Sequence, residues 1–327
     1  MASIRITLAI GDYDQTRDLV YGVVRPEGIE IVGLTLPIEE ITFRFLNFRE
    51  WDACEMSFAK YVSLRSQGDE SIVGLPVFPS RVFRLSSIYV PREGKVRTLA
   101  ALRGARIGIP EWAQTASIYT RGYIEHELGI PLDSIEWIQA AVNEPGRAEK
   151  VALKLPTGLR LTSAPQSSLN AMLIAGEIDA ALSARPPAAF ADGRIVRLVP
   201  QYRDAEEAYF RKTGIFPIMH VVALRRELLD SYPWIAMNLF KAFEEAKRRS
   251  LARLADITAS HAPLAWIGDY VARMRELFGA DPFPYGVEPN RRTLEAFLWF
   301  AHEQGVCHRK LGPEELFPKQ VQATHKV

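Results

Sequence analysis

One histidine stands where it could move a proton within a binding cleft. His220 lies in the apolar run Ile218–Val222, which is predicted to pass between two parts of the chain. An imidazole titrates near neutral pH, so it can give up a proton and recover it. The competing interpretation is a core histidine whose ring nitrogens are hydrogen-bonded to their neighbours. We expect His220 to be a proton donor.

Several arginines are candidates for binding the carboxylate groups of a small molecule, because a guanidinium matches a carboxylate with two parallel hydrogen bonds. The candidates are Arg81, Arg84, Arg121, Arg147 and Arg185. Arg81 and Arg185 each follow a predicted strand. Ser80 and Ser86 could add hydroxyl donors nearby, and Tyr13 could stack on an aromatic ring. For each arginine, the alternative is a solvated surface charge.

Acidic residues could complete such a site by accepting a proton or by orienting the histidine. The candidates are Asp12, Asp14, Glu55 and Glu111. Asp12 follows the first predicted strand, and Glu111 follows the strand Arg106–Ile109. Glu55 is expected to be partly buried. The alternative for Asp12 and Asp14 is the capping of a helix.

A cofactor is not expected. His220 with Glu55, Glu111 or Asp12 would offer an imidazole and carboxylates to a divalent metal ion. No local spacing such as His-x-x-x-His supports a metal site, so a metal is the less favoured alternative and no ligand is assigned. A glycine-rich phosphate loop and a lysine in a pyridoxal-type context are both absent from the sequence.

Strands and helices alternate along the chain, which is typical of open parallel sheets with helices on both faces. The predicted strands are Arg5–Ile10, Ile29–Leu36, Trp51–Met56, Ile72–Phe78, Ser87–Val90, Arg106–Ile109, Ile135–Gln139, Ile178–Ser183, Ile195–Leu198 and Met219–Leu224. The predicted helices are Thr16–Val20, Glu39–Asn47, Ser57–Ser66 with Ser57 as its N-cap, Thr115–Leu128, Ser168–Ala175, Pro233–Arg253, Leu264–Phe278 and Arg291–Gln304.

This order predicts an α/β fold of two lobes, each a mostly parallel sheet flanked by helices, joined by two crossing strands. We expect residues 1–91 and 220–327 to form one lobe and residues 92–219 to form the other. The crossings would lie near Ser87–Arg92 and Pro217–Leu224. In such a fold a ligand binds between the lobes, at the carboxyl ends of strands and the amino ends of helices.

Composition excludes several classes of protein. A length of 327 residues with 48% hydrophobic and 24% charged residues is typical of two globular domains. A net charge of +1 offers no overall field to nucleic acid or to an anionic membrane, and no apolar stretch approaches 18 residues. The alternating start Ile4–Ile10 does not resemble a signal peptide, and Cys54 and Cys307 match no zinc or redox spacing. We expect a cytoplasmic protein that binds neither nucleic acid nor membrane.

Short motifs follow one another in a fixed order along nearly the whole chain. They are Gly11-Asp12-Tyr13-Asp14, Cys54-Glu55-Met56-Ser57, Val77-Phe78-Pro79-Ser80-Arg81, Glu144-Pro145-Gly146-Arg147, Thr213–His220, Phe240–Lys247, Pro284-Tyr285-Gly286 and His302-Glu303-Gln304-Gly305. Together, from about Ile4 to about Phe317, the chain resembles the 4,5-dihydroxyphthalate decarboxylase family.

The resemblance implies a type II periplasmic-binding-protein-like fold without an export signal. It also implies a carboxy-lyase of phthalate catabolism, which converts 4,5-dihydroxyphthalate without oxidation to protocatechuate and carbon dioxide. The expected partner is therefore a small aromatic dicarboxylate. Arginines would hold its carboxylates, because burying a doubly charged aromatic without cations would be very unfavourable.

Other functions stay open at this point. A non-catalytic cytosolic binding or sensor protein for an aromatic carboxylate is the main alternative. A pyrimidine synthase of thiamine formation is disfavoured, because that family carries a cysteine-rich motif and this chain has two cysteines. Apolar positions on the C-terminal helices would allow a homo-oligomer.

Overall fold

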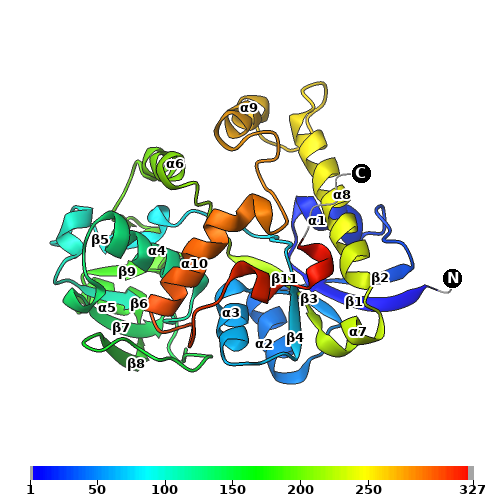
Figure 1. The fold of residues 1–327 in the computed structure, drawn as a ribbon. Coiled ribbons are helices and arrows are strands. Elements are labelled where there is room, and N and C mark those ends of the chain that lie inside the picture. Colours follow the sequence, from blue (N-terminus) through cyan, green and yellow to red (C-terminus); the bar gives the residue numbers. More distant parts are fainter. Residues whose placement is uncertain (1–2, 323–327) are drawn as a thin grey trace.

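The chain forms two lobes that lie side by side, as a computed structural model of residues 3–322 describes (Figure 1). The first lobe contains a five-stranded sheet of order β2-β1-β3-β11-β4, and the second contains a six-stranded sheet of order β10-β5-β9-β6-β7-β8. Helices flank both sheets. This arrangement confirms the predicted two-lobed α/β fold.

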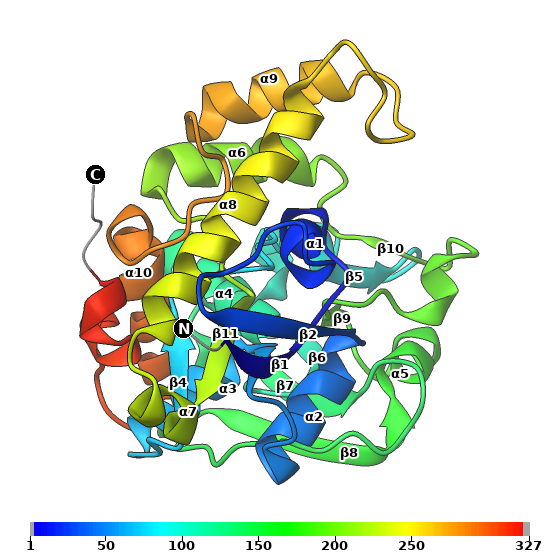
Figure 2. The ribbon, with the colours of Figure 1, turned by 90° about the vertical axis from the view of Figure 1, so that its right-hand side faces the viewer.

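The first lobe is assembled from the two ends of the described chain. Its strands are β1 (Ile4–Ile10), β2 (Ile29–Thr35), β3 (Ala53–Ser57), β4 (Ile72–Leu75) and β11 (His220–Arg225). Its helices are α1 (Asp14–Val20), α2 (Ile38–Phe48), α3 (Phe58–Ser66), α7 (Arg226–Ser231) and α8 (Ile235–Ala255). Strand β1 is parallel to β2 and β3, whereas β11 is antiparallel to both β3 and β4. Helices α1 and α8 lie on one side of this sheet and α2 on the other (Figures 1 and 2).

The second lobe is formed by the middle of the chain. Its strands are β5 (Ile88–Pro91), β6 (Arg106–Ile109), β7 (Glu136–Ala141), β8 (Arg160–Ser168), β9 (Ala180–Leu182) and β10 (Ile195–Arg197). Its helices are α4 (Thr115–Gly122), which continues in the π-helical turn Tyr123–Glu127, α5 (Leu169–Ala175) and α6 (Tyr202–Thr213). Strands β6, β7, β8 and β9 are parallel to their neighbours in that group, whereas β5 is antiparallel to β9 and β10.

Two C-terminal helices have unusual positions. Helix α10 (Arg291–Glu303) contacts α3 of the first lobe and α4 of the second, so it spans the junction between them. Helix α9 (Ile267–Phe278) stands apart from both sheets at the outer end of α8 (Figures 1 and 2). No helix among residues 3–322 has both the length and the apolar character that crossing a membrane requires.

Two elements of the second lobe escaped the sequence analysis. Strand β8 is rich in polar residues and contains Pro165, which a strand tolerates at the edge of a sheet, and β8 is an edge strand. Helix α6 is strongly polar and largely exposed, with Arg203 and Arg211 each one turn from Glu207. Such helices lack the apolar stripe from which helices are recognised.

The segments that cross between the lobes lie side by side. Arg81 and Ile218 form an isolated antiparallel bridge, the Met219 amide donates to the Ser80 carbonyl over 2.9 Å, and the Val82 amide donates to the Pro217 carbonyl over 3.2 Å. The predicted end of the first lobe's N-terminal part at residue 91 is corrected, because β5 pairs within the sheet of the second lobe. The chain therefore changes sheet before Ile88 rather than after residue 91.

Arg81 holds this junction together rather than a ligand. Its side chain is buried, and its guanidinium donates to the Phe216 carbonyl over 2.8 Å, to Asn290 Oδ1 over 2.7 Å and to the Pro284 carbonyl over 3.1 Å. The guanidinium also lies over the Phe216 ring. Burial lowers the pKa of Arg81 to about 10, which still leaves it charged at neutral pH. The predicted carboxylate clamp at this position is thus corrected.

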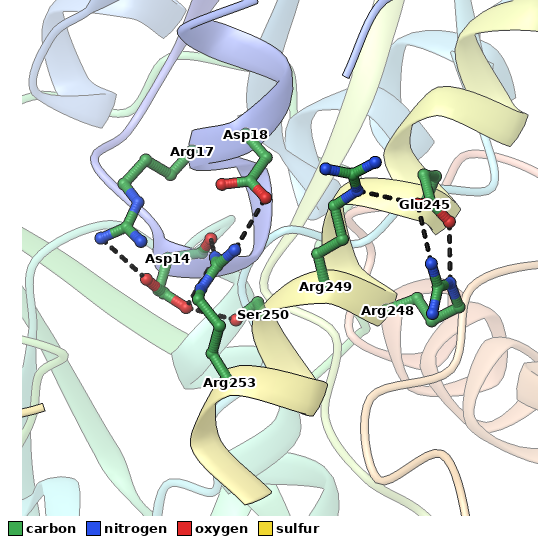
Figure 3. A network of polar contacts seen from close by, with 8 residues as sticks. All are labelled: Asp14, Arg17, Asp18, Glu245, Arg248, Arg249, Ser250 and Arg253. Atoms are coloured by element: carbon green, nitrogen blue, oxygen red, sulfur yellow. Dashed lines mark hydrogen bonds and ion pairs between the residues drawn. The ribbon is translucent and has the colours of Figure 1, made fainter. Parts of the chain in front are cut away.

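A second polar network fixes α8 against α1 (Figure 3). Ser250 donates to Asp14 over 2.5 Å, Arg253 donates to Asp18 over 2.7 Å, and Arg17 lies 3.2 Å from Asp14. Burial opposes ionisation of Asp14, but the hydrogen bond from Ser250 and the charge of Arg253 outweigh it and hold the pKa of Asp14 below its ordinary value. The network also holds α1, which begins directly after the turn that follows β1.

Replacing Arg81 with methionine should destabilise the protein by about 3 kcal/mol, because three buried acceptors would lose a charged donor. Urea unfolding followed by circular dichroism measures this loss. The matched control is Arg5→Met, since Arg5 is mostly exposed and pairs only with Glu30 at the surface. An Arg81→Met protein as stable as the Arg5→Met protein would contradict the assignment of Arg81 to the junction.

Candidate active site

A cavity of about 220 Å³ lies between the lobes, next to the crossing segments. Its polar lining comprises Glu39, Thr42, Ser57, Lys60 and His220 from the first lobe, Arg84 from the first crossing segment, and Glu111, Gln114, Thr115, Arg147, Lys150, Ser183 and Arg185 from the second lobe. His220 begins β11 and pairs with Ser57, the last residue of β3, because these strands are antiparallel. The sheet thus brings His220 to the carboxyl end of β3, as the two-lobed fold predicts.

His220 is paired with the buried carboxylate of Glu55. Its Nδ1 lies 2.5 Å from Glu55 Oε1, and the Glu55 side chain is fully buried. Glu55 also accepts hydrogen bonds from the Tyr13 hydroxyl over 2.7 Å and from the Gly11 amide over 2.8 Å. Among residues 3–322, His220 Nε2 has no hydrogen-bond partner, so this nitrogen remains available to a ligand. Of the carboxylates predicted to orient His220, Glu55 is therefore the one that contacts it.

The turn that follows β1 is shaped to hold this pair. A side chain at Gly11 would come within 2.8 Å of the Tyr13 ring and 3.1 Å of Glu55, so only glycine allows the approach. Burial and the neighbouring charge of Glu55 raise the pKa of Tyr13, which therefore stays protonated and donates. The expected stacking of Tyr13 on a ligand is corrected, because Tyr13 supports Glu55 from behind the cavity.

Glu111 lies in the cavity wall at the centre of a cluster of cations. Lys60 Nζ is 2.9 Å from one carboxylate oxygen, and Arg147 Nε is 2.7 Å and Lys150 Nζ 3.6 Å from the other. Burial alone would raise the pKa of Glu111, but the charges of Lys60 and Arg147 outweigh it and hold the pKa below its ordinary value. Glu111 is therefore ionised at neutral pH, which disfavours it as a proton donor.

Arg84 is a half-buried cation without an acidic partner among the described residues. Within the described part of the chain, no carboxylate lies within ion-pair distance of it, and its Nε contacts the sulfur of Met219 over 3.3 Å. Burial lowers the pKa of Arg84 to about 10, so it keeps its charge at neutral pH. Arg185, at the other side of the cavity, lies 2.8 Å from Glu39.

Positive charge exceeds negative charge in the cavity lining. Five cationic side chains face two carboxylates, those of Glu39 and Glu111. Helices α3 and α4 also begin here, since Ser57 and Gln114 are their N-cap residues, and the first turn of a helix carries a partial positive charge. The Ser57 hydroxyl does not cap its own helix as predicted. It lies 3.0 Å from the Thr115 hydroxyl of the opposite lobe.

Several predicted site residues lie outside this cavity. Asp12 is exposed and absent from the lining. Arg121 is fully buried, where it donates to Gln304 Oε1 over 2.8 Å and to the Trp112 carbonyl over 2.7 Å, and burial lowers its pKa to about 9. Ser80 and Ser86 belong to the first crossing segment, where their carbonyl groups accept hydrogen bonds. The four residues are thus corrected as members of this cavity, since none of them lines it.

Several residues of the lining carry no signal in the sequence that marks them as functional. Lys60 and Lys150 stand in segments without a recognisable motif, and Glu39 opens α2 with no neighbour in sequence that suggests a ligand. What Lys60, Lys150 and Glu39 share is their position, because each lies in the first turn of a helix or in a loop that faces the opposite lobe. Glu39 Oε2 and Ser183 Oγ are buried without a hydrogen-bond partner among the described residues, so both can contact a ligand.

Two proteins of known name are similar to this chain in sequence. The chain is 35% identical over 320 residues to a 4,5-dihydroxyphthalate decarboxylase of Comamonas testosteroni, which covers 97% of both chains. It is 34% identical over 209 residues to a 4,5-dihydroxyphthalate decarboxylase of Pseudomonas putida, which covers 64% of this chain and 81% of the other. No family model matches the chain.

Solved structures resemble the fold at low sequence identity. The periplasmic aliphatic sulphonate binding protein of Escherichia coli matches with a TM-score of 0.55 and 13% identity, covering 99% of this chain and 94% of that protein. A Candida albicans protein described as having the generic periplasmic binding protein fold matches with a TM-score of 0.52 and 11% identity, covering 99% of both. These likenesses confirm the periplasmic-binding-protein-like fold.

Replacing Glu111 with glutamine should destabilise the protein by about 3 kcal/mol at pH 7, because the buried Lys60 and the partly exposed Arg147 and Lys150 would lose their counter-charge. The folded-state pKa of Glu111 lies below its ordinary value of 4.5, so its stabilisation is complete above that pH and is lost as the pH falls through the folded-state pKa. Urea unfolding between pH 7 and pH 3 should therefore show a constant difference in unfolding free energy between wild type and Glu111→Gln above pH 5, and a difference that narrows as the pH falls below 4.5. A gap that widened instead would contradict an ionised Glu111.

Proposed function

This chain belongs to the 4,5-dihydroxyphthalate decarboxylase family, and from that premise we propose that its cleft converts 4,5-dihydroxyphthalate to protocatechuate and carbon dioxide. The observation that carries the proposal is the His220–Glu55 pair at the edge of a cavity whose cations outnumber its carboxylates. The pair supplies a proton, and the excess positive charge suits a substrate with two carboxylates.

The cations would bind and orient the substrate. Arg84 is the strongest candidate for a carboxylate clamp, because it is a desolvated guanidinium with no acidic partner in the described chain. Arg147 and Lys60 line the same cavity but already share Glu111. They can contact a second carboxylate while keeping that partner, since each ammonium or guanidinium group carries several donors.

Decarboxylation requires that a proton replace the departing carboxyl group. His220, as the imidazolium, would donate from Nε2 to the ring carbon that bears the carboxylate. The bond between that carbon and the carboxylate then breaks, its electron pair stays with the ring and restores aromaticity, and carbon dioxide leaves. Solvent returns a proton to Nε2. Glu55 keeps Nδ1 as the donor to its own carboxylate and stabilises the charged ring, as carboxylates do in other histidine pairs.

The hydroxyl group para to the leaving carboxylate would promote this step. When its proton is shared with an acceptor, the oxygen donates electron density to the carbon that is protonated. Glu39 Oε2 is the acceptor that the cavity offers, since this oxygen is buried and lacks a partner among the described residues. Glu39 would thus be the proton acceptor, a role that was predicted for Asp12 and Glu111.

The reaction is proposed to need no metal ion or organic cofactor. The carboxylates of the cavity are already neutralised, Glu111 by three cations and Glu39 by Arg185. The Nδ1 atom of His220 is occupied by Glu55. The donors left over are one imidazole nitrogen and the Oε2 atom of Glu39, which are too few to hold a divalent ion.

Purified protein should release protocatechuate and carbon dioxide from 4,5-dihydroxyphthalate, and treatment with a chelator should leave the rate unchanged. The His220→Ala variant should lose at least about 100-fold in kcat while still binding the substrate, because general acid catalysis contributes that much or more. Product formation followed by liquid chromatography measures turnover, and calorimetry measures binding.

The matched control is His261→Ala, because His261 is half-exposed near Asp256 and outside the cavity. It should retain wild-type kcat. Glu55→Gln keeps the shape of the pair but removes its charge, so it should lower kcat more than it alters KM. Tight binding without turnover by the wild type would favour the alternative of a non-catalytic binding protein. Full activity of His220→Ala would exclude His220 as the proton donor.

The homo-oligomer expected from the sequence also stays a proposal, and α9 supports it. This helix has no buried residue, and Leu264, Trp266 and Tyr270 are 65%, 82% and 55% exposed. An apolar cavity of about 590 Å³ lies between α8 and α9. A helix of 12 residues is marginal alone in water, so a second copy of the chain would stabilise it by covering these side chains. A cytoplasmic location stays a prediction.

Light scattering at micromolar concentration should therefore give a mass of at least two chains. Trp266→Ser together with Tyr270→Ser should shift the protein toward the mass of one chain, because two large exposed apolar side chains would be lost, one at the N-cap of α9 and one in its first turn. Tyr21→Ser is the matched control, since Tyr21 is 66% exposed but lies beyond the end of α1. A monomeric wild type would refute the proposal.

A further inference from the structure

A group of metal-ligating side chains lies where α4 meets α10, away from the cleft. We propose that Glu125, His126 and Glu303 bind one divalent transition-metal ion, for which Zn²⁺ is the natural probe. Within residues 3–322 they are the one group of three or more His, Cys, Asp or Glu side chains whose ligand atoms all lie within 4.8 Å of one another. None of the three lines the cavity that contains His220.

The spacing of the three groups fits a single ion. His126 Nε2 is 2.8 Å from Glu303 Oε2 and 4.0 Å from Glu125 Oε2. Ligands at zinc bond lengths of about 2.0–2.2 Å in a tetrahedron are about 3.3 Å apart. The two observed distances lie on either side of that value. Small rotations of the two glutamate side chains would therefore give all three ligands the required spacing.

The imidazole is held in a fixed orientation. Its centre lies 4.1 Å from that of Trp299 and 5.2 Å from that of the Phe300 ring, to which it is nearly parallel at 13°. Stacking of this kind leaves the nitrogens at the edge of the ring free for polar partners. Both carboxylates approach the same nitrogen, although one N–H group can donate well to only one of them. A metal ion at that place would serve both.

The group carries negative charge that no lysine or arginine neutralises. Among the described residues, the ion pairs of Glu125 and Glu303 are with His126 alone. Glu111, by contrast, is surrounded by three cations. Two carboxylates that converge without a cation are a favourable place for a divalent ion.

The backbone brings two of the ligands together. Glu125 and His126 are consecutive residues of the π-helical turn Tyr123–Glu127, and such turns occur often at functional sites. Glu303 is the last residue of α10. The ion would thus connect the helix α4 of the second lobe to the helix that also contacts α3 of the first. Its expected effect is to stabilise the junction between the lobes.

One imidazole and two carboxylates select a particular class of metal. Nitrogen ligands favour Zn²⁺, Co²⁺ and Ni²⁺ over Mg²⁺ and Ca²⁺, which prefer oxygen ligands alone. The competing occupant of the same space is a proton on His126, which would neutralise part of the charge without any metal. Measurement of metal binding separates these two cases.

The whole protein, treated with a chelator and then dialysed, should bind one Zn²⁺ per chain in calorimetry, and Zn²⁺ should raise its melting temperature. Co²⁺ should give visible absorption bands of a protein-bound ion. His126→Phe keeps an aromatic ring in the stack but removes the nitrogen ligand, and Glu303→Gln removes a carboxylate. Each should weaken Zn²⁺ binding by at least about tenfold, since even the partners of metal ligands contribute about 10–100-fold. Each should also abolish the shift in melting temperature.

His261→Ala is the matched control, because His261 lies 3.1 Å from Asp256 but has no second carboxylate beside it. This variant should bind Zn²⁺ as the wild type does. Absence of Zn²⁺ binding by the wild type at micromolar metal would overturn the proposal, as would binding that both ligand variants retain unchanged. Because neither readout uses decarboxylation, the outcome is independent of the function proposed for the cleft.

Discussion

The antiparallel pairing of β11 with β3 is the interaction on which the candidate active site depends. In this register His220 is opposite Ser57 and Val222 is opposite Glu55, so His220 and Glu55 are diagonal neighbours on one face of the sheet. A shift of the register by one residue would turn His220 to the other face and leave Glu55 as a buried charge without its partner. The pairing of Ser80 with Met219 and of Arg81 with Ile218 continues the same alignment into the crossing segments.

The arginines that the fold removes from water are of two kinds: some are hydrogen-bonded within the protein, and others face the cavity. Arg81 donates three hydrogen bonds and Arg121 donates two to carbonyl and amide oxygens of the protein, and neither lines the cavity. Arg84 is half-buried and faces the cavity without an acidic partner among the described residues. A cation such as Arg84 is expected to contribute strongly to the binding of an anionic ligand. Folding has already removed much of its hydration, so ligand binding has less of that free-energy cost to meet.

Much of the fold was predictable from the sequence because it follows from local patterns. The bounds of Arg106–Ile109 agree with β6, since this short apolar run lies between a glycine and a proline, and the alternation in Ile4–Ile10 predicted β1. The site was less predictable. His220 and Glu111 were identified because they follow or begin strands at the cleft, whereas Lys60 and Glu39 reach it from helices. Sequence alone does not distinguish the inward-facing Arg81 from the cavity-facing Arg84, because the difference depends on the position of Phe216 and Asn290 far along the chain.

The position of β11 between β3 and β4 has a consequence for the order in which the chain folds during synthesis. The second lobe consists of consecutive residues and can form as soon as they leave the ribosome. The first sheet cannot close at that time, because its fourth strand in spatial order is made after the entire second lobe. Until His220–Arg225 arrives, β3 and β4 present unpaired strand edges, which are the features of a nascent chain that most readily pair with another molecule. The strand that brings His220 to Glu55 is therefore also the one that ends the exposure of this sheet.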